Sequence, residues 1–212
     1  MNTPLELVTW DLDGTLYDRE ALKRSVRQRL TKAVRPGSWR SARDAGRALR
    51  KHRVHEARVR AAGGVVDAAA AAFWTGPLWS AFLAGFFLPA LAHIGPWPGV
   101  RRRLDRVAAA GVRQVVVSDY PVHDKLRALG LQDCFQGGFA GTEVGVLKPH
   151  PGLFRTVLGG LDVPAAAVLH VGDRPDTDGA AAASAGTRFA HVLAGDFVPV
   201  DAQLQAAGIP SN

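Results

Sequence analysis

Carboxylates, a serine and a lysine occur in four segments of this chain, each at or near the end of an apolar run. The segments are Asp11-Leu12-Asp13-Gly14-Thr15, Ser118-Asp119, Lys148-Pro149 and Gly172-Asp173 with Asp178. Several carboxylates gathered in one pocket repel one another unless a cation lies between them. Because the carboxylate segments contain no Cys or His, their oxygen ligands favour Mg²⁺.

These residue types can together transfer a phosphoryl group. A carboxylate such as Asp11, held against Mg²⁺, can attack phosphorus and form an aspartyl-phosphate. A second carboxylate two residues further on, Asp13, can protonate the departing alcohol and later deprotonate water. Ser118 can donate a hydrogen bond to the phosphoryl oxygens, and Lys148 can neutralise the charge that develops on them. Gly14 allows the backbone to turn sharply past the phosphorus.

The elements that must position these residues are strands that alternate with helices. Apolar runs predict strands at Leu5–Trp10, Val112–Val117, Ala167–Val171 and, more weakly, Thr187–Val192. Helices are predicted at about 99–110, 122–130, 151–161 and 176–186. This alternation predicts an α/β fold with a doubly wound parallel sheet. In such folds ligands bind outside the carboxyl ends of the strands, where the polar segments should converge.

The order of these segments resembles the haloacid dehalogenase superfamily, and specifically a phosphatase with an inserted helical cap of the C1 type. The resemblance rests on Asp11-Leu12-Asp13-Gly14-Thr15, Ser118, Lys148-Pro149 and Gly172-Asp173 with Asp178. It implies a Rossmann-like core at residues 1–16 and 97–212 and a helical cap at residues 17–96.

Roles for single residues follow from the resemblance. It implies Asp11 as nucleophile, Asp13 as acid and base, Ser118 as phosphoryl contact and Lys148 as charge stabiliser. Mg²⁺ would be held by the Asp11 side chain, the Asp13 backbone carbonyl and Asp173, with Asp178 supporting the metal site from its edge. The phosphate would be bound by four residues: Gly14, Ser118, Asp119 and Lys148. Asp119 stands where the family often has Asn, which alters the local charge.

Asp13 bears most directly on the choice of reaction. Similar dehalogenases and phosphonate-cleaving members lack an aspartate at this position, because they have no alkoxide to protonate. Its presence favours a Mg²⁺-dependent phosphohydrolase that acts on a small phosphorylated metabolite. A phosphosugar mutase of the same superfamily remains an alternative. A binding or regulatory protein that keeps the fold and docks on an anionic partner is a second one.

The positive charge of the chain is concentrated in one stretch. The 212 residues carry a net charge of +7. Residues 19–60 hold 15 Lys and Arg against three acids, a local net of +12, and the remainder has a net of −5. This basic stretch could steer an anionic substrate, dock on a partner or merely face water. Nucleic acid is disfavoured as a partner, since Trp39 alone interleaves an aromatic ring among these charges.

A long uncharged stretch follows the basic one. Residues 68–100 contain no Asp, Glu, Lys or Arg, and residues 68–92 predict one apolar helix. The stretch has the length of a membrane span, but glycines and prolines interrupt it, so no span is predicted. One stripe of this helix carries Trp74, Leu78, Phe82 and Phe86, and a second carries Trp79, Leu83 and Phe87. The second stripe could form a homodimer interface or line an apolar substrate pocket.

Two further features bear on the compartment. The N-terminal residues show no basic region followed by an apolar run, so no secretory signal is predicted. Cys134 is the single cysteine, which excludes an internal disulfide and favours a reducing compartment. A cytoplasmic location is therefore expected.

Overall fold

A five-stranded parallel sheet forms the centre of the molecule in a computed structural model that describes residues 3–34 and 39–210. The strands lie in the order β3-β2-β1-β4-β5. Their bounds are β1 Leu7–Trp10, β2 Arg113–Ser118, β3 Gly137–Ala140, β4 Val168–Gly172 and β5 Arg188–His191. The predicted α/β fold is confirmed, and the four predicted strands are β1, β2, β4 and β5. Strand β3 was not predicted, because its Gly137-Gly138 pair lacks the side chains that mark a strand.

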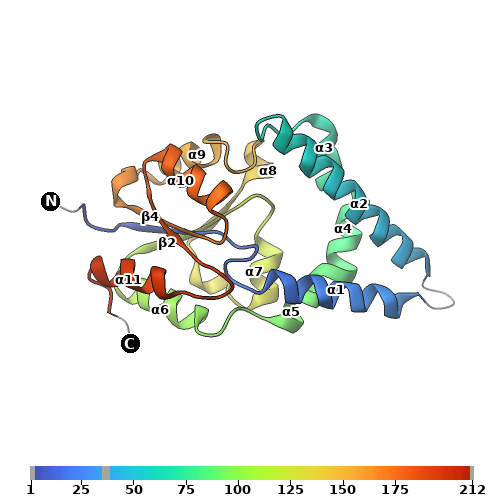
Figure 1. Ribbon diagram of the computed structural model, residues 1–212, viewed down its shortest axis with the longest axis horizontal. Coiled ribbons are helices and arrows are strands. Elements are labelled where there is room, and N and C mark those ends of the chain that lie inside the picture. Colours follow the sequence, from blue (N-terminus) through green and yellow to red (C-terminus); the bar gives the residue numbers. More distant parts are fainter. Residues whose placement is uncertain (1–2, 35–38, 211–212) are drawn as a thin grey trace.

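Helices cover both faces of this sheet (Figure 1). Successive residues of β2 alternate between the two layers: Val115 and Val117 pack in one hydrophobic cluster, and Val116 packs in the other. Side chains from α9 Gly152–Leu161 and α10 Ala180–Ala185 cover the first face. Those from α6 Val100–Ala109, α7 His123–Leu129 and α11 Val198–Ala206 cover the second.

Shorter turns connect these elements. Helix α8 spans Gly141–Val144, and 3-10 turns span Gln132–Cys134 and Ala165–Ala167. A π-helical turn at Pro175–Gly179 leads into α10. The helix predicted at about 176–186 therefore consists of two segments with different hydrogen-bond spacing.

The helices between β1 and α6 form a separate layer beyond the carboxyl ends of the strands (Figure 1). We call this layer the helical insert. It comprises α1 Arg19–Ala33, α2 Trp39–Ala61, α3 Ala68–Trp74, α4 Pro77–Phe82, a π-helical segment at Leu83–Phe87 and α5 Leu88–Ile94. Helix α5 contacts α7, so the insert also packs against the core.

The prediction of one continuous helix over residues 68–92 is wrong. Helix α3 ends before Gly76, and α4 restarts at Pro77, which has no N–H to donate within a continuing helix. By length and composition Ala68–Ile94 could still cross a membrane. Within the described residues, however, its four segments pack against α1, α2 and α7, and Trp79, Phe82 and Phe86 are buried. The absence of a membrane span stays a prediction.

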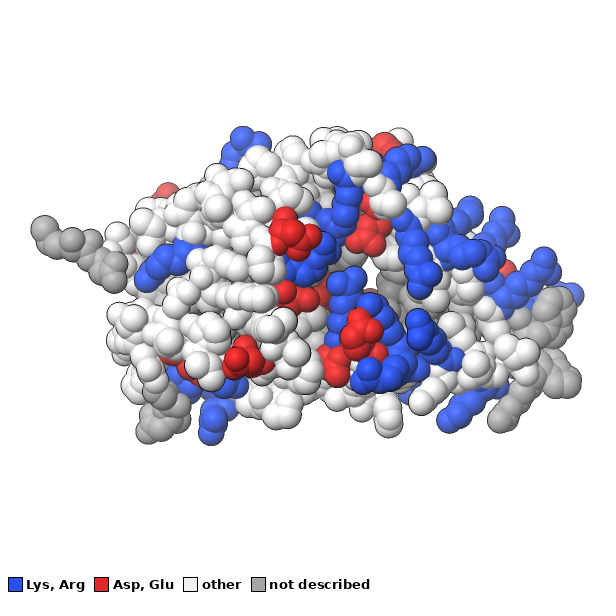
Figure 2. Space-filling model, viewed as in Figure 1, with Lys and Arg blue, Asp and Glu red and all other residues white. Residues whose placement is uncertain are grey.

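The positive charge lies mainly over the helical insert (Figure 2), as its concentration in residues 19–60 of the sequence indicates. Figure 2 shows Lys and Arg side chains gathered over the helices of the insert, while the adjoining face of the core carries few of them. Between the two parts this face is hollowed, and both acidic and basic side chains flank the hollow (Figure 2). The carboxyl ends of the strands point towards this region (Figure 1).

Candidate active site

The order of the strands brings the predicted site residues together. Strand β1 pairs with β2 on one side and β4 on the other, so the segments that follow these three strands are neighbours. The backbone N–H of Asp11 donates to the carbonyl of Val171 over 2.8 Å, which fixes the turn after β1 beside β4. One small cavity of about 40 Å³ is lined by all but one of the predicted site residues: Asp11, Asp13, Ser118, Asp119, Lys148, Asp173 and Asp178. The exception is Gly14.

Asp11 is buried at the floor of this cavity. Its Oδ1 accepts a hydrogen bond from Lys148 Nζ at 2.6 Å, and its Oδ2 accepts one from the Thr15 hydroxyl at 2.9 Å. Burial raises the pKa of Asp11 to about 8, although the Lys148 ammonium opposes the rise. Asp178 and Asp173 add to it. Lys148 and Thr15 thus hold the Asp11 carboxylate in place. Its negative charge is nevertheless not fully neutralised by its neighbours, because its pKa stays raised.

Asp13 has a different set of partners. Its Oδ1 accepts a hydrogen bond from the Tyr17 hydroxyl, and its Oδ2 accepts hydrogen bonds from Lys125 Nζ and, at 3.3 Å, from the Ser118 hydroxyl. Burial disfavours the charged form, but Lys125 and Tyr17 outweigh it and lower the pKa of Asp13. Two carboxylates on one turn therefore differ in their preferred protonation state.

Lys148 joins the two sides of the cavity. Its Nζ donates to Asp11 Oδ1 and lies 2.6 Å from Asp178 Oδ1, and it also donates to the Val117 carbonyl at 3.0 Å. These carboxylates raise the pKa of Lys148 despite its burial. The ammonium is therefore retained at neutral pH and can meet negative charge on a ligand at Asp11.

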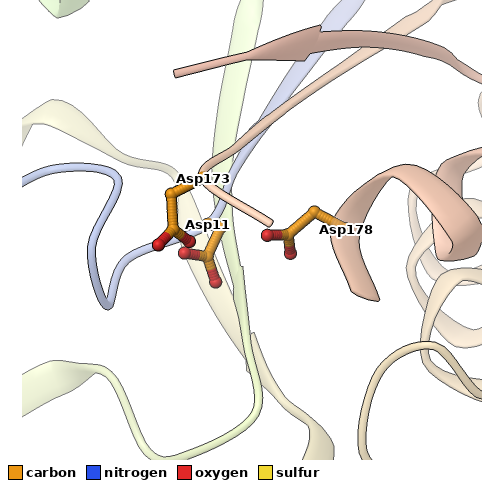
Figure 3. A group of neighbouring side chains, drawn as sticks. All are labelled: Asp11, Asp173 and Asp178. Carbon is orange, nitrogen blue, oxygen red and sulfur yellow. The ribbon is translucent and has the colours of Figure 1, made fainter. Parts of the chain in front are cut away.

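Three carboxylates face one another next to this lysine. Oxygen atoms of Asp11, Asp173 and Asp178 lie within 4.8 Å of one another (Figure 3). Asp11 follows β1, and Asp173 and Asp178 follow β4. An all-oxygen donor set of this kind fits Mg²⁺. Burial, and then repulsion between the carboxylates, raises the pKa of both Asp11 and Asp173, and a divalent cation would offset that repulsion. The side chain of Asp13 lies outside this group.

The positions of Asp178 and Gly14 differ from those expected from the sequence. Asp178 was expected to support the metal site from its edge. It is 1% exposed, lies within the carboxylate group and also accepts a hydrogen bond from the Arg174 backbone N–H. Gly14 was expected to bind phosphate. It has φ of 109°, and a Cβ there would lie 2.3 Å from Asp173 Oδ2, so the absence of a side chain makes room for a carboxylate of the candidate metal site.

Asp119 links the insert to the core through its side chain. Its Oδ1 accepts a hydrogen bond from the Lys148 backbone N–H at 2.7 Å, and its Oδ2 accepts one from Arg60 of α2 at 2.9 Å. Arg60 also donates to the Lys148 carbonyl and to Glu56. The carboxylate that replaces the more usual Asn is thus explained by its partner Arg60, which carries the matching charge.

Four contact residues of this site were missed in the sequence analysis. Thr15 and Tyr17 stand four residues after Asp11 and Asp13, and that spacing was the available signal. Lys125 and Arg60 lie far from their partners in the sequence, so no local pattern indicates them. His170 of β4 is a hydrogen-bonded core residue, because its ring is fully buried and its Nδ1 lies 2.9 Å from the Thr9 hydroxyl.

Comparisons with curated proteins find phosphatases. The chain is 33% identical over 106 residues to glyceraldehyde 3-phosphate phosphatase of Pyrococcus abyssi, and 36% identical over 108 residues to phosphoglycolate phosphatase of Rhodospirillum rubrum. The matched parts cover 48% and 50% of this chain, and 44% of each relative. The chain therefore matches less than half the length of these two relatives.

Solved structures share the fold over most of its length. A predicted phosphoglycolate phosphatase from Haemophilus somnus aligns with a TM-score of 0.62 and 23% identity, covering 91% of this chain and 87% of its own. L-2-haloacid dehalogenase from Xanthobacter autotrophicus aligns with a TM-score of 0.62 and 21% identity, covering 97% and 84%. The family model for haloacid dehalogenase-like hydrolases matches residues 5–186, which include every residue of the candidate site. The chain therefore belongs to the haloacid dehalogenase-like hydrolases.

Proposed function

We propose that the protein is a Mg²⁺-dependent phosphohydrolase that cleaves a phosphate monoester through an aspartyl-phosphate on Asp11. The observation that carries this proposal is the pairing of Asp11 and Asp13 on one turn with separate lysine partners, Lys148 and Lys125. A nucleophile and an acid–base group must act on opposite sides of the same phosphorus, and this arrangement supplies one carboxylate for each task.

In the first half-reaction Asp11 attacks phosphorus, and the bond from phosphorus to the alcohol oxygen breaks. Lys148 and the Ser118 hydroxyl lie close enough to the carboxylates to contact the phosphoryl oxygens. The alcohol leaves with a proton from Asp13. Although Lys125 and Tyr17 lower the pKa of Asp13 in the free protein, the negative charge of a bound phosphate raises it.

In the second half-reaction a water molecule attacks the phosphorus of the aspartyl-phosphate. Asp13, now ionised, takes the proton of that water, and Asp11 leaves as a carboxylate with inorganic phosphate as the product. The Lys125 and Tyr17 contacts stabilise the ionised form of Asp13 and so favour its action as a base.

Asp11, Asp173 and Asp178 are the side chains that would hold Mg²⁺. When bound, the ion supplies positive charge that orients the phosphate and reduces the electrostatic repulsion between the phosphate and the attacking carboxylate. Gly14 keeps the space that Asp173 occupies, and Lys148 holds Asp11 and Asp178 in place.

The test is phosphate release from an aryl phosphate by the purified protein with Mg²⁺. We expect turnover by the wild type, and a loss of about 10²- to 10⁴-fold in kcat for Asp13→Asn, which removes the acid and base. Asp124→Asn, an exposed acid on α7, is the matched control and should keep wild-type turnover. Wild-type rates in Asp13→Asn would contradict the assigned role.

The proposal includes a cytoplasmic location. It is supported by Cys134, the single cysteine of the sequence, which is free and half-buried, as is common for chains in reducing compartments.

A further inference from the structure

A second, larger cavity lies under the helical insert. Its volume is about 360 Å³, and it is bounded by α1, α2, α4 and the π-helical segment of the insert and by the start of α7. Four residues line both this cavity and the small catalytic one: Asp13, Arg19, Glu56 and Tyr120. The two cavities therefore meet at Asp13, the residue proposed to protonate the leaving alcohol. The part of a substrate beyond the phosphate must extend into the larger cavity.

The walls of the larger cavity are mainly aromatic and aliphatic. Six of its apolar lining residues come from four parts of the insert, α1, α2, α4 and the π-helical segment: Val26, Leu49, Trp79, Phe82, Leu83 and Phe87. The π-helical segment Leu83–Phe87 contributes both of its end residues. Trp79 and Phe82 lie with their ring centroids 5.1 Å apart. Such a surface gains free energy from covering an apolar ring or chain.

Most of the polar side chains within these walls are already engaged, but the Tyr120 hydroxyl is buried without a hydrogen-bond partner and could meet one polar group of a ligand. Lys125 donates to Asp13, and His52 accepts a hydrogen bond from Trp74 Nε1 at 3.1 Å. The His52 ring also stacks on Trp79, with centroids 4.6 Å apart. Glu56 accepts two hydrogen bonds from Arg60. A leaving group with several hydroxyls would lose its hydrogen bonds to water here without gaining equivalent ones.

Apart from Lys125, which is buried and pairs with Asp13, the cations that line the cavity lie at its mouth. Arg19, Lys23, Arg27 and Arg53 line it and are exposed to solvent. They can attract the phosphate dianion, while the apolar walls receive the rest of the substrate. The basic stretch of the sequence and the second apolar stripe, Trp79, Leu83 and Phe87, thus meet at one cavity.

We propose that the substrate is a phosphate monoester of an apolar, ring-bearing alcohol. This inference rests on the proposed phosphohydrolase function and adds its substrate class. It sets this chain apart from a protein whose preferred substrate is a short phosphorylated acid or a phosphorylated sugar. The π-helical segment is the main specificity element, because Leu83 and Phe87 contact the ring in this account.

The test compares esters that differ in the apolar group but share an alkyl oxygen as leaving group. We expect kcat/KM for 2-phenylethyl phosphate to exceed that for ethyl phosphate, phosphoglycolate or glucose 6-phosphate by about tenfold or more. Equal values for the phenylethyl and ethyl esters, or a preference for either of the other two, would overturn the inference and leave the phosphohydrolase function intact.

Two matched leucine variants test whether the cavity wall is responsible for the preference for the phenylethyl ester. Leu83→Ala should lower the ratio of kcat/KM for the phenylethyl over the ethyl ester by about tenfold. Leu88→Ala, a half-buried leucine that does not line the cavity, should leave this ratio at its wild-type value. An unchanged ratio in Leu83→Ala would also overturn the inference.

A binding measurement tests the proposed apolar subsite independently of the proposed phosphohydrolase function. Calorimetry with 2-phenylethyl phosphonate and ethyl phosphonate measures the affinity of the apolar cavity for each compound without any turnover. The phenylethyl compound should bind about tenfold more tightly. If the protein hydrolysed no ester but kept this preference, the phosphohydrolase function would be wrong and the apolar subsite would stand. Equal affinities would contradict the subsite itself.

Discussion

Asp11 and Asp13 stand two residues apart on one turn, yet their surroundings shift their pKa values in opposite directions. Burial and neighbouring carboxylates raise the pKa of Asp11 to about 8, whereas Lys125 and Tyr17 lower that of Asp13. Asp11 therefore needs additional positive charge to act as a nucleophile, and the carboxylate group around it can bind the cation that supplies such charge. Asp13 is already ionised and suits the role of base.

Gly14 is predicted to be indispensable because of the space that it leaves. In Gly14→Ala the new Cβ would meet Asp173 Oδ2 at 2.3 Å, at a φ of 109° that L-residues rarely adopt. We expect a loss of about 2 kcal/mol in the free energy of unfolding, measured by urea denaturation. Gly159→Ala on α9, where a Cβ meets nothing within 4 Å, is the control and should be neutral or slightly stabilising. Equal stability of the two variants would contradict the close approach of Asp173.

Metal binding should appear as a change in thermal stability. We expect Mg²⁺ at about 100 times its Kd to stabilise the wild type by about 2.7 kcal/mol relative to the protein in EDTA. Asp173→Asn removes one carboxylate of the group and should abolish the shift in Tm. Asp176→Asn is the control, because Asp176 is exposed and pairs with Arg174 outside the group. A full shift in Asp173→Asn would exclude Asp173 as a ligand.

At the scale of elements, the insert is tied to the core next to the catalytic lysine. Arg60 of α2 binds both Asp119 after β2 and the Lys148 carbonyl, and the Leu147 backbone N–H donates to the Gly64 carbonyl at 2.8 Å. Val65 and Val146 form an antiparallel bridge beside this contact. The position of α2 and that of Lys148 are therefore coupled.

Arg60 should contribute more to stability than its neighbour Arg58. Arg60→Met removes the donor to Asp119 Oδ2 and to the Lys148 carbonyl in a largely buried place, and should cost about 2 kcal/mol in the free energy of unfolding. Arg58→Met breaks an exposed ion pair with Asp67 and should cost less than about 0.5 kcal/mol. Urea denaturation of both variants checks the difference, and equal losses would contradict a structural link through Arg60.

The insert should also lose stability in mild acid through His52. Burial lowers the pKa of His52 from 6.5 to about 4, although Glu56 opposes the shift. Since the unfolded chain binds a proton below about pH 6.5 and the folded one does not, stability falls as pH drops from there towards 4. The Gln side chain in His52→Gln can still accept the hydrogen bond from Trp74 but does not titrate. Between about pH 7 and about pH 5, the free energy of unfolding of this variant should therefore fall by about 2 kcal/mol less than that of the wild type. Parallel pH curves for the two proteins would refute this.

The sequence predicts much of the core and less of the insert. Apolar runs that end in Asp11, Ser118 and Asp173 mark the carboxyl ends of three neighbouring strands, so the convergence of the site follows from the topology. Lys125 and Arg60 could not be predicted, because they reach their partners through tertiary packing across 112 and 59 residues. The apolar run over residues 68–92 indicates helix, but its division depends on the backbone at Gly76 and Pro77.

Over the whole molecule, the net charge of +7 combines a basic insert and an acidic remainder. Four of the insert's cations lie at the mouth of the larger cavity, above the carboxylate group of the core. This arrangement supports attraction of an anionic substrate over docking on nucleic acid. A homodimer through residues 68–92 stays a prediction, which sedimentation of the full chain would test.

The central claim is that phosphate passes through Asp11, and trapping the intermediate tests it most directly. The wild type is mixed with Mg²⁺ and an aryl phosphate that carries a radioactive phosphoryl group, and the reaction is quenched in acid within one turnover. We predict label bound covalently to the protein and located at Asp11 by mass spectrometry, with no label and at least about thousandfold slower phosphate release in Asp11→Asn. Phosphate release at the wild-type rate by Asp11→Asn, or turnover with no label on Asp11, would contradict the account.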